Sequence, residues 1–223
     1  MDSVLVNTAQ TVTNETSLLA IAAKGGFLMV ILAVISILAI SIIIERLLKY
    51  KKLNNNEEEF MQQVYSLVSE NNLDKAIHTC EQQNNSPIAR IIARAIGTAH
   101  KDYLVVKEIA ESALKKEVHF MERKLGTLAT IAAIAPLIGF LGTVTGMVKV
   151  FMKLGESGGG VDISLLANGI WEALITTIGG LTVGIITIMF YNHLVGKVEE
   201  MAQDLEDNAY EFILTYRRVR DEN

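Results

Sequence analysis

The sequence predicts an all-α membrane protein with three membrane-spanning helices and long helical extensions outside the bilayer. Half of the 223 residues are hydrophobic and a fifth are charged, but the two classes are segregated along the chain. Three windows contain almost no charge, and each approaches the ~20 residues that a helix needs to cross a bilayer. They are 25–44, 125–148 and 173–192. Long apolar runs rich in Leu, Ile and Ala favour helices, since only helices and closed barrels satisfy their backbone groups in lipid.

The first window is interpreted as a retained anchor and not as a cleaved signal peptide. The 24 residues before Gly25 are half polar, without a basic segment at the start of the chain. The apolar run also exceeds the ~7–15 residues of a signal-peptide core. This window shows no polar face, so we expect it to contact lipid on the outside of an assembly.

Basic residues after the first window, before the second window and in the C-terminal tail predict the orientation of the chain, because cytoplasmic segments carry the excess of Lys and Arg. They are Arg46, Lys49, Lys51 and Lys52, then Arg123 and Lys124, then Arg217, Arg218 and Arg220. The segment between the first two spans and the C-terminal tail are therefore expected to be cytoplasmic. The predicted organisation is an outer N-terminal segment (1–24), spans at 25–45, 125–149 and 167–193, a cytoplasmic helical domain (46–124), a short outer loop (150–166) and a cytoplasmic C-terminal helix (194–223).

The predicted cytoplasmic segments carry only helical patterns. Asn72 is expected to cap a helix over 73–82, and Ser86 a second helix with Pro87 in its first turn. The second helix has an apolar stripe formed by Ile88, Ile91, Ile92, Ala95 and Ile96. No helix breaker lies between Leu104 and Gly126, so this helix is predicted to run straight into the second span. The third span is likewise predicted to continue into 196–218.

The second predicted span presents a smooth face of small residues. Pro136, Gly139, Thr143 and Gly146 fall on one face at 100° per residue, and Gly142 and Gly146 form a GxxxG pattern. Close helix packing is the favoured interpretation of these glycines. The Thr143 hydroxyl could line a polar path or bond a carbonyl of its own helix. Pro136 is predicted to kink the span, because it removes a backbone hydrogen bond.

The third predicted span contains a single acid, Glu172. A charge in a membrane helix is costly and usually faces a bundle interior or a cavity, although this position near the outer boundary also allows a carboxylate that faces water. Thr176 shares its face and Thr177 lies on the flank. Gly180 and Gly184 are predicted packing positions in the same helix.

Together the two spans predict half of a polar pathway. In antiparallel spans Thr143, Thr176 and Thr177 fall at comparable depth, which places several hydroxyls near one acid. A complete proton relay needs further titratable groups deeper in the membrane, and this chain has none. The missing group must come from another chain, or this chain does not transport protons.

Composition excludes several other functions. The net charge of −5 is spread along the chain, and no basic stripe indicates nucleic acid. The single cysteine, Cys80, cannot form an intramolecular disulfide, and the four histidines show no metal-ligand spacing. We therefore predict no metal site and no cofactor. An enzyme is also disfavoured, because the chain has no Ser/His or HExxH arrangement suited to intramembrane catalysis.

Two motifs resemble the ExbB/TolQ/MotA proton-channel family, most closely its ExbB and TolQ branch. They lie at 136–147, with the order PLIGFLGTVTGM, and at 169–180, with the order GIWEALITTIGG. The resemblance implies an inner-membrane motor driven by the proton-motive force. Five copies would surround single-span ExbD- or TolR-like subunits that bring a membrane aspartate, and a TonB- or TolA-like protein would receive the mechanical output. It also assigns the family's functional glutamate to Glu172 and its pore threonines to Thr143 and Thr177.

The resemblance leaves several points open. Many relatives carry a proline late in the third span, where this chain has Ile186, so a straighter inner half is expected. The role could be ExbB-like or TolQ-like, and the driving ion could be H⁺ or Na⁺. A passive channel or structural scaffold, in which the polar face only packs helices, is the alternative from another functional class.

Overall fold

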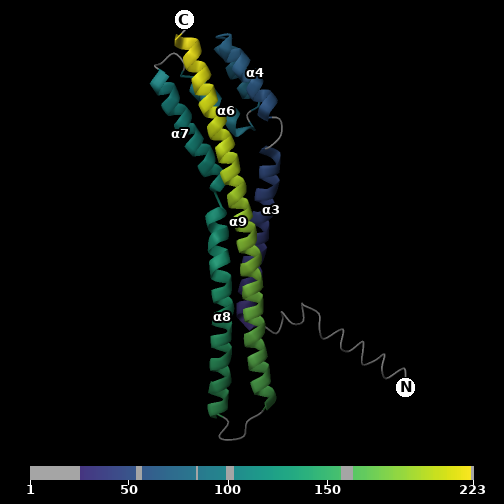
Figure 1. Cartoon of the computed structure of the whole chain (residues 1–223). Coiled ribbons are helices and arrows are strands. Elements are labelled where there is room, and N and C mark those ends of the chain that lie inside the picture. The colour runs from purple at the N-terminus through teal and green to yellow at the C-terminus, as the bar shows by residue number, and fades with distance from the viewer. Residues whose placement is uncertain (1–25, 54–56, 84, 99–102, 157–162, 222–223) are drawn as a thin grey trace, which may run out of the picture. The chain divides into compact units, whose positions relative to one another are not determined.

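The computed structural model describes residues 26–53, 57–83, 85–98, 103–156 and 163–221, and every regular element in these ranges is an α-helix (Figure 1). The helices are α3 (Gly26–Leu53), α4 (Glu57–Ser69), α5 (Leu73–Gln82), α6 (Pro87–Ile96), α7 (Tyr103–Glu122), α8 (Leu125–Glu156) and α9 (Ile163–Asp221). The predicted all-α class is confirmed for these ranges. The predicted N-terminal segment, 1–24, lies outside them.

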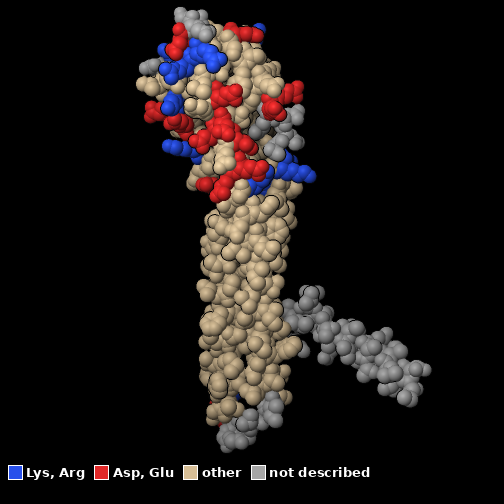
Figure 2. Space-filling model, in the orientation of Figure 1, with Lys and Arg blue, Asp and Glu red and all other residues tan. Residues whose placement is uncertain are grey.

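The chain divides into two compact units. The apolar unit contains the described residues of 1–43 and 126–191, and the charged unit those of 44–125 and 192–223. Figure 2 shows the difference between them, because Lys, Arg, Asp and Glu gather on the charged unit and are almost absent from the visible face of the apolar unit.

Three helices are long and apolar enough to cross a membrane, as predicted. They lie within Gly26–Leu53, Tyr103–Glu156 and Leu166–Asp221, and the second of these segments comprises α7 and α8. Within a single chain many of their large apolar side chains are exposed, including Phe27 and Phe140. Apolar surface of this extent is covered by lipid or by other membrane helices.

The predicted continuous helix from Leu104 into the second span is wrong, because α7 ends at Glu122 and α8 begins at Leu125. Lys124 has a φ of 75°, a left-handed conformation that an α-helix does not accommodate. Its ammonium group pairs with the Glu45 carboxylate of α3. The helix is therefore interrupted at a position that has neither glycine nor proline. The Lys124 side chain at this position forms an ion pair with α3.

Helix also occupies much of the predicted outer loop at 150–166. α8 continues through Glu156, and α9 begins at Ile163. No helix breaker lies between Lys149 and Leu154, so nothing in that stretch stops α8. The predicted continuation of the third span is confirmed, since α9 is one helix of 59 residues.

The charged unit is built around α6, which packs against α5 and α7. All five residues of its predicted apolar stripe are buried. Asn72 and Ser86 occupy the predicted N-cap positions of α5 and α6, but neither side chain makes a capping hydrogen bond. The Ser86 hydroxyl is buried and has no hydrogen-bond partner among the described residues.

A bidentate ion pair links α6 to α7. The Arg90 Nε and terminal nitrogen donate to the two Glu117 carboxylate oxygens, at 3.0 and 2.6 Å. The Glu117 side chain is 9% exposed and that of Arg90 27%. Such fork-to-fork geometry fixes two helices more specifically than a single contact does.

Candidate functional site

Small residues bring α8 and α9 into close antiparallel contact within the apolar unit. A Cβ atom added to Gly180 would lie 2.7 Å from the Gly139 Cα, and one added to Gly184 would lie 2.5 Å from the Pro136 Cγ. Further along, a Cβ on Gly142 would meet the Thr176 side chain at 2.5 Å. The backbones therefore approach each other at distances that only glycine permits.

The five glycines that we predicted as packing positions all lie in this contact and are buried. They are Gly139, Gly142, Gly146, Gly180 and Gly184. Pro136 lies inside α8, which continues past it, and its ring faces Gly184. Its role in this structure is thus a packing contact opposite a glycine, and the kink stays a prediction.

Thr177 joins the two helices by a hydrogen bond. Its hydroxyl, on α9, donates to the Gly139 carbonyl oxygen of α8 at 2.9 Å. The bond lies at the crossing where Gly139 and Gly180 meet. Sequence reasoning identified Thr177 but did not identify this partner, because the pairing depends on the register of α8 against α9.

Thr143 is half-buried on α8 and bonds within its own helix. Its hydroxyl donates to the Phe140 carbonyl oxygen at 2.6 Å. A hydroxyl is both donor and acceptor, so this oxygen can still accept a further hydrogen bond. The same holds for Thr177.

Glu172 lies at a small cavity of about 260 Å³ formed by α3, α8 and α9. The lining residues are Phe27, Leu28, Leu141, Gly142, Thr145, Lys149, Glu172 and Thr176. The Glu172 side chain is 33% exposed, and its Oε1 lies 3.4 Å from the Lys149 Nζ. The carboxylate is therefore neither enclosed in the helix contact nor fully open.

The structure thus separates the four predicted pathway residues into two pairs. Glu172 and Thr176 line the cavity, whereas Thr143 and Thr177 are absent from its lining and bond to carbonyls of α8. Thr176 is 1% exposed, and its hydroxyl donates to the Glu172 carbonyl oxygen at 2.7 Å. Its side chain is packed against Gly142 rather than presented to an open surface.

Two cavity residues were missed by sequence reasoning. Lys149 is the last residue of the second predicted span (125–149) and Thr145 lies inside the motif at 136–147, but neither was singled out. Both follow Thr143 on α8, and antiparallel packing brings the end of the second span beside the start of the third. The predicted loop at 150–166 offered no signal for this pair, because Lys149 lies directly before it and Glu172 six residues after it. The pairing follows from the continuation of α8 through Glu156.

α3 is not only the lipid-facing anchor that we predicted, because one of its faces packs inside the apolar unit. One face is exposed, with Val34 and Ile37 more than half accessible. On the other face Leu32 is buried, and the Met29 thioether lies 3.0 Å from a Cβ built on Gly179. With Phe27 and Leu28 at the Glu172 cavity, α3 also closes one side of the candidate site.

Comparison with known proteins agrees with the two motifs. Residues 83–207 match the MotA/TolQ/ExbB proton channel family. The chain belongs to this family. It is 33% identical over 198 residues to the ExbB-like 1 biopolymer transport protein of Synechocystis sp., a match that covers 88% of this chain and 78% of that protein.

Other relatives carry both branch names. The ExbB-like 3 biopolymer transport protein of Synechocystis sp. is 30% identical over 200 residues, covering 89% of this chain and 94% of that protein. The Tol-Pal system protein TolQ of Haemophilus influenzae is 36% identical over 106 residues, covering 48% of this chain and 46% of that protein. The family is one of proton-channel transport components and not a known class of enzyme.

Proposed function

We propose that the chain is an ExbB-like subunit of an inner-membrane motor driven by the proton-motive force. Five copies form a ring around ExbD-like single-span subunits, and the motor energises a TonB-like protein for import through the outer membrane. The observation that carries this proposal is the cavity between α3, α8 and α9, in which Glu172 stands beside Lys149 and Thr176. An ionisable group held at a membrane cavity is typical of an ion path.

In the proposed mechanism the partner supplies the second titratable group. Residues 126–148 and 173–190 contain no ionisable side chain, so protons cannot pass this chain by side-chain relay alone. An aspartate of the ExbD-like subunit would take up and release protons as it passes Thr143, Thr177 and Glu172. Each protonation change alters the attraction between the two chains and so drives their relative rotation.

The hydroxyls suit this role because they can exchange partners. Thr143 and Thr177 donate to the carbonyl oxygens of Phe140 and Gly139. After a rotation about one side-chain bond, either hydroxyl could donate its hydrogen bond to a carboxylate or a water on the partner side instead. The hydroxyls would then position the partner's carboxylate without titrating themselves.

The proposed topology follows the distribution of basic residues. The N-terminus would lie in the periplasm and the C-terminus in the cytoplasm, with Glu172 near the periplasmic end of its span. Arg46 and Lys124 would then mark the cytoplasmic boundary.

The proposal is tested by complementation of energised uptake. Glu172→Ala, Thr143→Val and Thr177→Val should each abolish uptake while the ring still assembles. Thr182→Val is the matched control, because Thr182 is exposed on α9 and its hydroxyl bonds the Ile178 carbonyl of its own helix at 2.8 Å. If all three pathway variants kept full activity, the assigned pathway would be wrong.

Two other functions remain distinguishable by experiment. The TolQ match supports a TolQ-like role in the Tol-Pal system. The ion pair of Glu172 and the backbone bonds of the threonines are also compatible with a passive channel or scaffold that needs no partner. Co-purification with a co-encoded single-span subunit bearing a membrane Asp favours the motor, and a TonB- or TolA-like neighbouring gene indicates the branch.

A further inference from the structure

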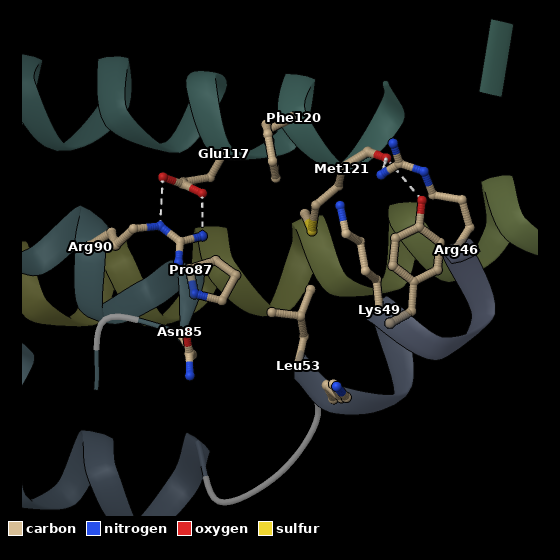
Figure 3. Close-up of a pocket in the computed structure, with 11 residues that line it drawn as sticks. Arg46, Lys49, Leu53, Asn85, Pro87, Arg90, Glu117, Phe120 and Met121 are labelled. Atoms are coloured by element: carbon tan, nitrogen blue, oxygen red, sulfur yellow. Dashed lines mark hydrogen bonds and ion pairs between the residues drawn. The ribbon is translucent and has the colours of Figure 1, made fainter. Parts of the chain in front are cut away.

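A cavity of about 630 Å³ lies within the charged unit, apart from the Glu172 site (Figure 3). Its lining includes four cationic side chains and one acidic side chain: Arg46, Lys49, Lys52, Arg90 and Glu117. Leu53, Pro87, Phe120 and Met121 form apolar walls between them. The volume is in the range of sites that hold small ligands.

Arg46 is the most unusual member of this lining. It is 3% exposed, and its Nε has no hydrogen-bond partner among the described residues. One terminal nitrogen lies 3.5 Å from the Met121 carbonyl oxygen, at the limit of a hydrogen bond, and the Tyr50 hydroxyl already donates to that oxygen at 2.8 Å. The guanidinium also interacts with the Tyr50 hydroxyl and is attracted by the neighbouring Glu45, but no carboxylate hydrogen-bonds it among the described residues. A buried guanidinium in this situation is costly unless an anion reaches it.

The remaining charges leave the cavity cationic. Glu117 is engaged by Arg90 in the bidentate pair, so it does not neutralise the other side of the cavity. Lys49 lies 3.5 Å from Glu45 and above the Phe120 ring, with its side chain 47% exposed. In Figure 3 the Arg90–Glu117 pair stands at one side, with Lys49 and Arg46 at the other.

We propose that this cavity binds a phosphate group, held by Arg46 and Lys49 between the apolar walls of Leu53 and Phe120. The guanidinium fork of arginine matches phosphate oxygens, and lysine adds a second charge-assisted contact. The phosphate can belong to an anionic phospholipid headgroup or to a free phosphate compound. Arg46 and Lys49 directly follow the apolar window of α3, which is where headgroup phosphates meet a spanning helix.

The test uses the purified full-length protein and three probes. Binding of dioctanoyl phosphatidylglycerol and dioctanoyl phosphatidylcholine is measured by native mass spectrometry, and binding of inorganic phosphate by titration calorimetry. Lys49→Gln should weaken binding of the anionic probe about tenfold, the effect of one lost charge-assisted contact. Lys107→Gln is the matched control, because its side chain is also 47% exposed and also pairs with a glutamate four residues away.

Arg46→Gln should weaken binding at least as much, and Arg46→Lys should recover part of it. If Arg46→Gln fails to fold, the comparison of Lys49→Gln with Lys107→Gln still tests the proposed phosphate site. Binding of phosphatidylglycerol alone identifies a headgroup site, and competition by inorganic phosphate identifies a site for free phosphate compounds. The proposal is overturned if no anionic probe binds saturably, if phosphatidylcholine binds equally well, or if both lysine variants weaken binding equally.

Discussion

Lys149 of α8 and Glu172 of α9 form an ion pair, with 3.4 Å between the lysine Nζ and the carboxylate Oε1. The lysine side chain is 64% exposed and the glutamate 33%. The pair joins the end of one predicted span to the start of the next, at the rim of the Glu172 cavity. Lys149 therefore lies within ion-pair distance of the proposed pathway carboxylate.

The coupling between these two residues should be small in stability terms. An exposed pair of this kind contributes roughly 0.2–1 kcal/mol, because solvent screens it. A double-mutant cycle of Lys149→Gln and Glu172→Gln, measured by unfolding in detergent, should give a coupling energy of about that size. A coupling above about 2 kcal/mol would show that the pair is a main structural link and not an adjustable contact.

Replacement of Gly180 by alanine should destabilise the apolar unit. The new Cβ would lie 2.6 Å from the Ala135 carbonyl oxygen and 2.7 Å from the Gly139 Cα, so the two backbones must separate. Overpacking of this kind costs about 1–3 kcal/mol. Thermal unfolding in detergent should show a lower Tm.

Gly196→Ala provides the control in the same helix. No atom lies within 4 Å of a Cβ built there, so alanine should be neutral or stabilise by up to about 1 kcal/mol through helix propensity. Equal Tm values for the Gly180 and Gly196 variants would contradict the close contact of α8 with α9.

Much of this architecture follows from local sequence patterns. The stripe from Ile88 to Ile96 predicts a buried face because its spacing is helical, and the glycines of both spans predict close packing because small residues permit it. The break at Lys124 was not predictable in the same way. No glycine or proline marks the position, and the Glu45 that pairs with Lys124 is far away in sequence.

The site was predictable in its residue types but not in its pairings. Glu172 stood out as an acid beside apolar windows, and the threonines as hydroxyls between glycines. The bond from Thr177 to Gly139 and the contact of Lys149 with Glu172 require the register of two helices.

The Arg90–Glu117 pair should be a strong contact of the charged unit. Glu117→Ala leaves a largely buried guanidinium without its bidentate acceptor, which should lower the free energy of unfolding by about 2–3 kcal/mol. Urea unfolding would measure the change. Glu200→Ala removes a carboxylate that is 62% exposed and should change stability by less than about 0.5 kcal/mol. Similar losses in both variants would contradict the importance of the buried pair.

Cys80 should react slowly with thiol reagents until the charged unit unfolds. The thiol is buried, and burial raises its pKa from 9.0 to about 12, so the reactive thiolate is scarce at neutral pH. Maleimide labelling at pH 7.5 should therefore be slow in the native protein and fast in denaturant. Fast labelling of the native protein would show that this part of the unit opens readily.

The same shift predicts a pH dependence. The unfolded thiol ionises above its usual pKa near 9.0 while the folded thiol stays protonated up to about 12. The folded state then binds the extra proton, so the contribution of Cys80 to stability is complete below pH 9 and is lost as the pH rises towards 12. Cys80→Ala should reduce the loss of stability over this range.

Proton flux into proteoliposomes tests the central claim most directly. The chain is reconstituted with its single-span partner, a membrane potential is imposed, and the internal pH is followed with a dye. Glu172→Gln should reduce the flux to that of protein-free liposomes, whereas the control Thr182→Val should match the wild type. Wild-type flux through the Glu172→Gln protein would contradict the assignment of this carboxylate to the proton pathway.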